Sequence, residues 1–505
     1  MPLLIRFLAL IGLLGAVSPV MAREPASDAA ARASLPEWVE FLRLPNVPTG
    51  KGTVMRANAD WLETHLARRG FAVERLGDPD APAVFAQSPA ARRGAPTILF
   101  YAHFDGQAVD AAQWDQADPF EPVLKEKDAA GRWQPVPMAR LAEAGPEWRL
   151  FARSAADDKA PIVMLLAAID ALRAEGGKPT VRVKILLDPE EESGSAGLDA
   201  VVRRHAALLA ADAVVMLDGP LHASNRPTIV FGHRSVATFT LTVFGARGEL
   251  HSGHYGNFAP NPARDLAALI GSFTDGQGRV AIPGFYDGVD LGPGVRAALG
   301  SVPEDEPAML ARLGIARPDR VGRTYQEALA YPSLNVIALS AADVAHPRTI
   351  IPASATAKFD IRTVPGTPGD RQIALVRRFV EAQGFHLVDG VPTEEDRRTY
   401  PRLAAISGSG GTPALATSLT SPVGTWAATA IERTFGTPPV RIPMMGGSVP
   451  SWPLVDGLKA PVLLLPLVNP DNNQHAANEN MRLGNYFDGV RTLLALLKEP
   501  YPAQR

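Results

Sequence analysis

The sequence predicts an α/β protein in which a smaller α+β domain is inserted into a larger layered domain. Short apolar runs alternate with stretches whose apolar residues recur at a helical period, which is typical of a sheet covered by helices. A middle section contains two further strand–helix pairs of its own. Residues that could bind a metal follow several of the apolar runs directly, and in open α/β sheets ligands gather at the carboxyl ends of strands.

The composition excludes several classes of protein. The chain has 505 residues, enough for roughly two to four domains, and 46% hydrophobic with 20% charged residues argues against disorder or a coiled coil. Its net charge of -3 leaves no basic excess for a nucleic-acid backbone. Cysteine is absent, which excludes disulfides, thiol nucleophiles, thiolate-ligated metals and a lipoprotein anchor. Any metal site must therefore use carboxylates and some of the 10 histidines.

The first 22 residues read as a secretory signal. Arg6 precedes an apolar run from Phe7 to Val17, and small residues end the segment at Val20-Met21-Ala22. The run is shorter than the roughly 20 apolar residues that span a bilayer. We expect a mature, soluble protein that begins near Arg23, is periplasmic or secreted, and has no membrane partner after cleavage. An uncleaved anchor is the alternative.

The larger domain is expected in two parts, residues 23–233 and 416–505. The run TILFYA predicts a buried strand at 97–102, and apolar residues at i, i+3, i+4, i+7 and i+10 predict a helix over 161–175. Further strands are predicted by the alternation at 181–187 and by two apolar runs, at 213–217 and 462–467.

The inserted domain is expected over residues 234–415. It contains two predicted strands, at 238–244 and 355–364, each followed by a helical stripe. The stripes comprise Leu266, Leu269, Ile270 and Phe273, and later Ile373, Val376, Phe379 and Val380. The Gly- and Pro-rich stretch 275–335 is predicted as loops, and SGSGGT at 407–412 as the linker back to the larger domain.

Potential metal ligands follow the predicted strands or begin a predicted helix. They are His103, Asp105, the pair Asp157-Asp158, the run Glu190–Glu192, Asp218 and His475. Each is ambiguous alone, because His-x-Asp is common, an Asp pair caps helices, and acidic runs are usually solvated. Three carboxylates directly after a buried strand would repel one another, however, and a cation relieves that repulsion. Two imidazoles with three carboxylates suit Zn²⁺ or a similar divalent ion.

Eight segments, in this order, resemble one zinc-hydrolase family. They are YAHFDGQ, SAADDKAP, DPEEESGS, MLDGP, ELHSGHYGN, PASATAKFDIRTVP, GGSVPSWPL and NQHAANEN. That family contains carboxypeptidase G, aminoacylase, succinyl-diaminopimelate desuccinylase and the carnosinase-like dipeptidases, and HSGHYGN and DGQGRVAIPGFYDGV are most similar to the last branch. The resemblance implies a zinc-exopeptidase-type α/β/α sandwich with a ferredoxin-like lid and dimerisation domain. One departure is Ala152-Arg153-Ser154, where the family usually has Gly-Arg-Gly.

The resemblance also implies the roles of the metal-site residues. Asp157 would bridge two divalent ions per chain, with Zn²⁺ expected and Mn²⁺ or Co²⁺ as alternatives. One ion would be completed by His103 and Asp218, and the other by Glu192 and His475. Asp105 would orient the His103 ring, and relatives often have a cis peptide between Asp157 and Asp158. Glu191 would be the general base for a water that bridges the metals.

Substrate contacts are implied in the same way. His251 would donate to the oxyanion, in many relatives across a homodimer formed by the lid, and Arg362 would bind a substrate carboxylate. The turn at Gly447 and Ser448 would supply donors, while Asn335, His233 and His254 are weaker candidates. The alternatives are a local hydrogen bond for His251, an ion pair with Asp360 or another acidic residue for Arg362, and an ordinary turn at 446–448.

The sequence therefore predicts an exported dinuclear metallopeptidase acting on dipeptides or short peptides with a free C-terminal carboxylate. An N-acyl amino-acid deacylase is the second enzyme hypothesis, and a catalytically silent binding protein is the alternative from another class. A serine hydrolase and a zincin are disfavoured, because the sequence has neither Gly-x-Ser-x-Gly nor His-Glu-x-x-His.

Overall fold

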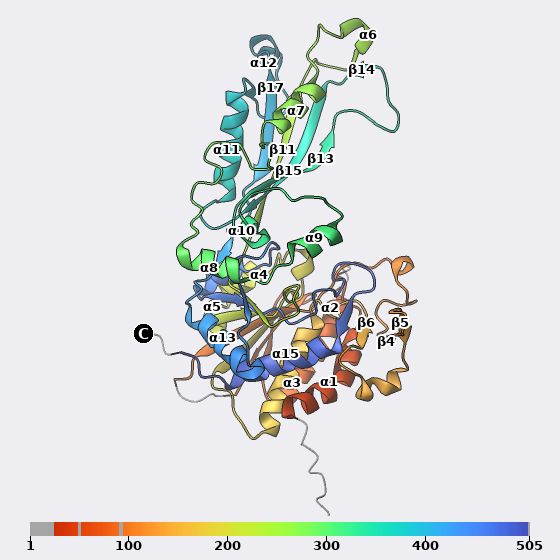
Figure 1. The fold of residues 1–505 in the computed structure, drawn as a ribbon, viewed down its shortest axis with the longest axis vertical. Helices are drawn as coiled ribbons and strands as arrows, with labels where there is room; N and C mark the ends of the chain where they lie inside the picture. Colours follow the sequence, from red (N-terminus) through yellow and green to blue (C-terminus); the bar gives the residue numbers. More distant parts are fainter. Residues whose placement is uncertain (1–24, 49–51, 90–93, 503–505) are drawn as a thin grey trace, which may run out of the picture.

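The molecule is elongated, with a large domain at one end and a narrower lid projecting from it (Figure 1). This computed structural model describes residues 25–48, 52–89 and 94–502, so the predicted signal at 1–22 lies outside the described residues. Within these ranges, no helix combines the length and the apolar character that crossing a bilayer requires.

An eight-stranded mixed sheet forms the centre of the large domain. Its order is β1 (Ala72–Gly77), β2 (Pro82–Gln87), β7 (Arg182–Asp188), β3 (Thr97–His103), β8 (Ala213–Met216), β20 (Val462–Leu464), β9 (Thr228–Val230) and β19 (Val440–Ile442). The central strand β3 runs parallel to both β7 and β8, and β20 runs parallel to β8. The predicted buried strands are therefore confirmed, and their carboxyl ends meet at one edge.

Helices cover both faces of this sheet. One face carries α1 (Ala26–Leu42), α2 (Thr53–Arg68), α3 (Lys159–Ala174), α13 (Pro422–Phe435) and α15 (Leu483–Lys498). The other carries α4 (Leu198–Arg204), α5 (Ala206–Leu209) and α14 (Trp452–Leu458). This is the expected α/β/α sandwich.

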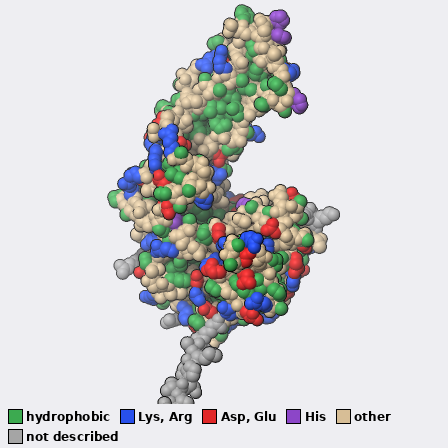
Figure 2. All heavy atoms as spheres, turned by 45° about the vertical axis from the view of Figure 1, so that its right-hand side comes forward, with side chains coloured by type: hydrophobic (Ala, Val, Ile, Leu, Met, Phe, Trp, Pro, Cys, Tyr) green, Lys and Arg blue, Asp and Glu red, His purple; other side chains and the backbone are tan. Residues whose placement is uncertain are grey.

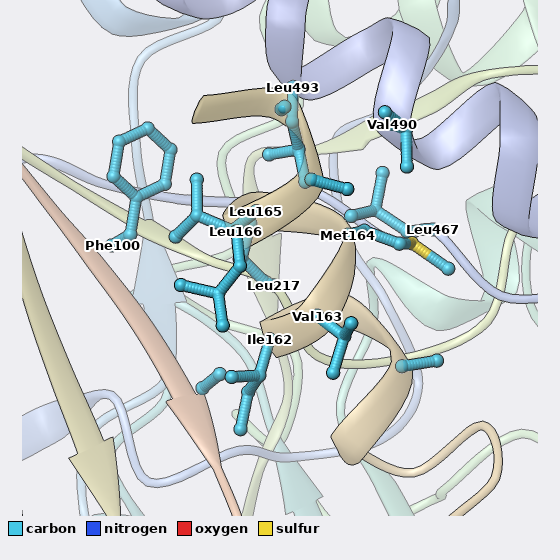
Figure 3. Close-up of a cluster of buried hydrophobic side chains, with 14 of the residues drawn as sticks. Phe100, Ile162, Val163, Met164, Leu165, Leu166, Leu217, Leu467, Val490 and Leu493 are labelled. Atoms are coloured by element: carbon cyan, nitrogen blue, oxygen red, sulfur yellow. The ribbon is translucent and has the colours of Figure 1, made fainter. Parts of the chain in front are cut away.

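Helix α3 is apolar on nearly every side because it lies between the sheet and α15. Figure 3 shows Leu165 and Leu166 between Phe100 of β3 and Leu493 of α15. The two helices approach closely at Gly489, where an added Cβ would lie 2.3 Å from the Met164 Sδ. This packing fixes the start of α3, which follows the Asp157-Asp158 pair directly.

The lid is a five-stranded sheet with helices on one face. Its order is β13 (Ser333–Ser340), β15 (Ser354–Thr363), β11 (Ser235–Phe244), β17 (Leu403–Ser409) and β16 (His386–Leu387). Helices α7 (Pro262–Gly271) and α11 (Gly369–Ala382) enclose a separate apolar core against it. The chain order β11-α7-β13-β15-α11-β17 with antiparallel neighbours is the expected ferredoxin-like topology.

The two domains meet where β10 (Gly232–His233) pairs with β18 (Leu415–Ala416). The predicted boundary 233/234 directly follows β10, and the predicted boundary 415/416 lies inside β18. The outer end of the lid carries β12 (Leu250–His251), β14 (Ile350–Ile351) and α6 (Ser252–Tyr255) (Figure 1).

A further small sheet lies beside the large one. It has the order β21 (Asn480–Arg482), β6 (Arg149–Phe151), β4 (Val123–Lys127) and β5 (Trp133–Pro135). It brings the segment before α3 next to the segment after His475.

Two expectations for the lid are wrong. The stretch 275–335 contains three short helices, α8 (Pro293–Ser301), α9 (Glu306–Leu313) and α10 (Tyr325–Leu329). Proline stands in the first turn of α8 and α9, where a helix tolerates it. The prolines of this stretch are therefore not a sign of loops. Residues 407–409 of the predicted linker belong to β17, since Gly408 lies so close to β11 that a Cβ would be 2.3 Å from the Thr238 carbonyl oxygen.

Candidate metal centre

The five predicted metal ligands converge into two groups that share Asp157. One group contains His103, Asp157 and Asp218, and the other contains Asp157, Glu192 and His475. In each group the potential ligand atoms lie within 4.8 Å of one another. This is the arrangement that the family resemblance implies, with one carboxylate common to two groups that could each hold a cation.

Strand ends and one helix start deliver these ligands. His103 is the last residue of β3, Glu192 lies in the turn after β7, and Asp218 is two residues beyond β8. Asp157 is two residues before α3 and is joined to Asp158 by the expected cis peptide bond. His475 comes from the loop after β20.

The His475 loop depends on residues that tolerate a left-handed backbone. Asn473, His475 and Asn478 have φ values of 57°, 61° and 61°. Asn adopts this conformation more readily than most residues, which accounts for the Asn-rich sequence DNNQHAANEN. The loop turns the His475 Nε2 to 3.1 Å from Asp157 Oδ2 and 3.2 Å from Glu192 Oε2.

Asp105 orients both the imidazole ligand and the turn that carries the acids. Its Oδ1 lies 3.2 Å from His103 Nδ1 and accepts a 3.0 Å hydrogen bond from the Glu191 N–H. Its Oδ2 accepts from the Glu192 N–H at 3.0 Å. The carboxylate is fully buried, so it holds the His103 tautomer that leaves Nε2 facing Asp157 Oδ1, 2.9 Å away.

Three further features of the centre follow no pattern in the sequence. Gln107 donates to Glu192 Oε2 at 2.7 Å. Asp188 accepts from the Tyr101 hydroxyl at 2.8 Å and the Ser195 hydroxyl at 2.6 Å, which anchors both ends of the acidic turn. Glu479 is completely buried against the segment before Asp157.

The site strongly favours positive charge. Hydrogen bonds to Asp157 and Glu192 raise the pKa of His475 to about 10. Burial alone would lower the pKa of His103, but its hydrogen bonds to Asp105 and Asp157 raise it well above its usual value. Burial opposes ionisation of Asp157, yet bonds from His103 and His475 hold its pKa well below the ordinary range. Three carboxylates and two imidazoles in this field fit two divalent cations.

Glu191 lies in this turn between Glu190 and the ligand Glu192. Burial, with support from Asp218 and Asp157, raises its pKa to about 8.

The predicted substrate-binding residues are not gathered at the metal ligands. Arg362 Nε donates to Asp360 Oδ2 at 3.1 Å, which is the ion pair that the sequence left open as an alternative. Asn335 binds the other oxygen of Asp360 at 2.7 Å. Gly447 and Ser448 are exposed, and the Ser448 hydroxyl donates to the Arg234 carbonyl at 2.7 Å.

His233, His251 and His254 differ in their surroundings. His233 is buried and uses both ring nitrogens locally, at 2.8 Å from the Arg234 carbonyl and 2.7 Å from the Ser451 hydroxyl. His251 and His254 are exposed at the outer end of the lid, with ring centroids 4.6 Å apart, and His251 Nδ1 accepts from the Gly253 N–H. His251 directly precedes α6, which lies at the outer end of the lid and away from the large domain that carries the potential metal ligands (Figure 1).

An α/β/α domain with two groups of potential metal ligands that share a carboxylate, joined to a ferredoxin-like lid, is typical of metal-dependent hydrolases of the exopeptidase type. The family model "Peptidase family M20/M25/M40" matches residues 99–499. The chain belongs to this family and is a metallopeptidase.

Curated relatives and a solved structure agree with this placement. The chain is 29% identical to the Cys-Gly metallodipeptidase dug1 of Schizosaccharomyces pombe, over 80% of this chain and 79% of that protein. It is 27% identical to the Beta-Ala-His dipeptidase of Rattus norvegicus, over 80% and 77%. The M20 family metallo-carboxypeptidase Sso-CP2 from Sulfolobus solfataricus has a similar fold, with a TM-score of 0.71 and 26% identity over 92% of this chain and 99% of that one.

Proposed function

We propose that this protein hydrolyses the amide bond of dipeptides or short peptides with a free C-terminal carboxylate. The observation that carries the proposal is the pair of ligand groups that share Asp157, with Glu191 in the adjoining turn. The names of the relatives, which are a Cys-Gly and a Beta-Ala-His dipeptidase, support a dipeptide as the substrate class. Zn²⁺ is the proposed ion, because imidazole and carboxylate ligands in small clusters are typical of it.

In the proposed mechanism, the bound cations, Glu191 and Asp105 have separate roles. Two bound cations would polarise the scissile carbonyl and make a water molecule more acidic. Glu191 takes the proton from that water and returns it to the leaving amine. Asp105 accepts hydrogen bonds from the backbone N–H groups of Glu191 and Glu192. These bonds hold the base and the neighbouring ligand at fixed positions in the turn.

Arg362 is the proposed partner of the substrate carboxylate. It lies on the face of the lid sheet that the helices leave uncovered, beside Val236 and Ser333 in the strand register. A guanidinium suits a carboxylate because it can offer two parallel N–H groups. In the structure, Asp360 accepts a hydrogen bond from Arg362 Nε. A substrate carboxylate would therefore either replace Asp360 or bind the guanidinium together with Asp360.

Amine release from matched substrates tests the function. Dipeptides, their C-terminal amides and N-acetyl amino acids would be compared with metal-loaded protein, with a chelator as control. We expect cleavage that the chelator abolishes and that is confined to dipeptides with a free carboxylate. Preference for N-acetyl amino acids would instead support a deacylase on the same site, and no cleavage across the panel would support the binding-protein hypothesis.

The same panel tests Arg362. In Arg362→Ala, KM should rise for free-carboxylate dipeptides, by roughly 10- to 100-fold for a lost charged contact, and change little for the amides. An equal loss on both kinds of substrate would mean that Arg362 only supports the lid through Asp360.

A homodimer through the lid is the proposed assembly. The edge strand β13 has an unpaired outer side and exposes Val336, Ile337 and Leu339 by 46%, 57% and 61%. Exposed apolar edge strands are uncommon in monomers because they invite pairing with another chain. Figure 2 shows hydrophobic side chains gathered along the lid, which supports this surface as the interface.

The dimer would bring His251 to the metal centre of the partner. Co-expression of differently tagged His251→Ala and Glu191→Gln chains should produce mixed dimers in which one of the two sites contains both intact residues. With random pairing, about one quarter of the wild-type activity should return, although each variant alone is nearly inactive. Mixed dimers without activity would place His251 outside the catalytic machinery.

Export is proposed from the sequence of residues 1–22 alone. Its test is the N-terminal sequence of the protein recovered from the periplasm or medium, with Arg23 as the expected first residue.

A further inference from the structure

The carboxylate of Glu479 is buried without any exposure, four residues after His475 and directly before β21. Its Oε1 accepts the N–H groups of Ala156 and Asp157, both at 2.9 Å. Its Oε2 accepts the Ser154 N–H at 2.9 Å and Arg153 Nη1 at 2.8 Å. Four donors converge on one side chain, so both oxygens of the carboxylate are satisfied by protein groups.

These bonds connect two of the three segments that carry the ligand group Asp157, Glu192 and His475. Asp157 belongs to both ligand groups, and its own N–H is one of the donors to Glu479. Glu479 in turn shares a loop with His475. The connection is reinforced where Arg153 Nη2 donates to the Ala476 carbonyl at 3.3 Å and the Ala152 N–H donates to the Glu479 carbonyl at 3.2 Å.

The bridge also accounts for an unusual backbone. Ser154 has a φ of +60°, a region that residues with a Cβ rarely adopt. Its N–H is held by Glu479, and its hydroxyl accepts from the Asn46 side chain at 2.8 Å. The turn into Asp157 is therefore fixed from both sides, with a serine where the family usually has glycine.

We propose that Glu479 is a positioning residue that fixes Asp157 relative to His475 and thereby sets the affinity of both cation sites. The inference rests on the proposed ligand assignment but not on the substrate. A carboxylate is required, because a glutamine amide would turn its NH₂ toward backbone N–H donors on one side of the bridge. Relaxation of that contact moves the shared ligand away from the His475 loop.

The test is the affinity for Zn²⁺, measured by competition between chelator-stripped protein and a chromophoric chelator. Glu479→Gln should weaken Zn²⁺ binding at both sites by about 10- to 100-fold, as found when partners of metal ligands are removed. Circular dichroism and the Tm of the metal-free protein should show that the variant is folded.

A matched control variant distinguishes the positioning of metal ligands from a general loss of folding stability. Glu37 is another acid bound to a buried arginine, with its Oε2 2.8 Å from Arg69 Nη2, but it lies on α1 and contacts no ligand. Glu37→Gln should lower the Tm and leave the affinity for Zn²⁺ unchanged. Equal weakening in both variants, or wild-type affinity in Glu479→Gln, would overturn the proposal.

If the Glu479→Gln protein does not fold, a second variant tests the same proposal. Arg153→Met removes the one charged donor to Glu479 and leaves its three backbone donors, so binding should weaken by about 10-fold, the lower end of that range. Unchanged affinity in the folded Arg153→Met protein would also overturn the proposal. The titration requires no peptide, so a protein that binds Zn²⁺ but cleaves nothing would refute the proposed function and not this inference.

Discussion

Glu191→Gln is expected to lower kcat by about 10²- to 10⁴-fold while the bound metal stays at the wild-type level. The reason is chemical, since glutamine keeps the shape of the side chain but cannot accept the proton of the attacking water. Asp105 binds the backbone N–H of residue 191, so the turn itself should survive the substitution. Single-turnover kinetics and metal analysis on the same preparation would measure both quantities.

Glu190→Gln is the matched control for this prediction. Glu190 precedes Glu191 in the same turn, but its carboxylate accepts from the Gly197 N–H instead of facing the ligands. Turnover should therefore stay close to wild type. Near-normal turnover in Glu191→Gln would remove Glu191 from the role of general base.

Asp157→Ala is expected to abolish binding of both cations, because this carboxylate is common to the two ligand groups. The loss of affinity should exceed the roughly 10- to 100-fold that follows removal of a partner of a ligand. Activity should fall with the metal content and should not return when the metal concentration is raised to a level that saturates the wild type.

His475→Ala provides the comparison, since His475 belongs to one group only. Metal analysis should find one ion retained in His475→Ala and none in Asp157→Ala. Two ions in Asp157→Ala, or an unchanged metal content in His475→Ala, would contradict the shared-ligand arrangement.

The ligands could be predicted because four of the five follow a predicted strand and Asp157 directly precedes a predicted helix. A buried strand has a clear apolar pattern, and its end locates His103, Glu192 and Asp218 at one edge of the sheet. The family resemblance then implied which ligands bind which of the two ions, an assignment that hydrophobic periodicity cannot give.

The residues that hold the ligands in place could not be predicted in the same way. Glu479 and Gln107 act through contacts with backbone or side chains far away in the sequence, and such contacts follow no period. Arg362 shows a different limit, because Asp360 stands two residues earlier on the same face of β15 and is an equally good partner. A sequence cannot choose between that neighbour and a substrate.

The interruption of the large domain by the lid has a consequence for the order of folding during synthesis. The first helix packs on the last, where Trp38 stacks on Tyr486 at 4.8 Å and the Ser34 hydroxyl lies 2.7 Å from that of Tyr486. The lid is continuous in the chain and can complete its sheet first. The metal centre cannot form until His475 has left the ribosome, so a nascent chain contains a finished lid before it contains an active enzyme.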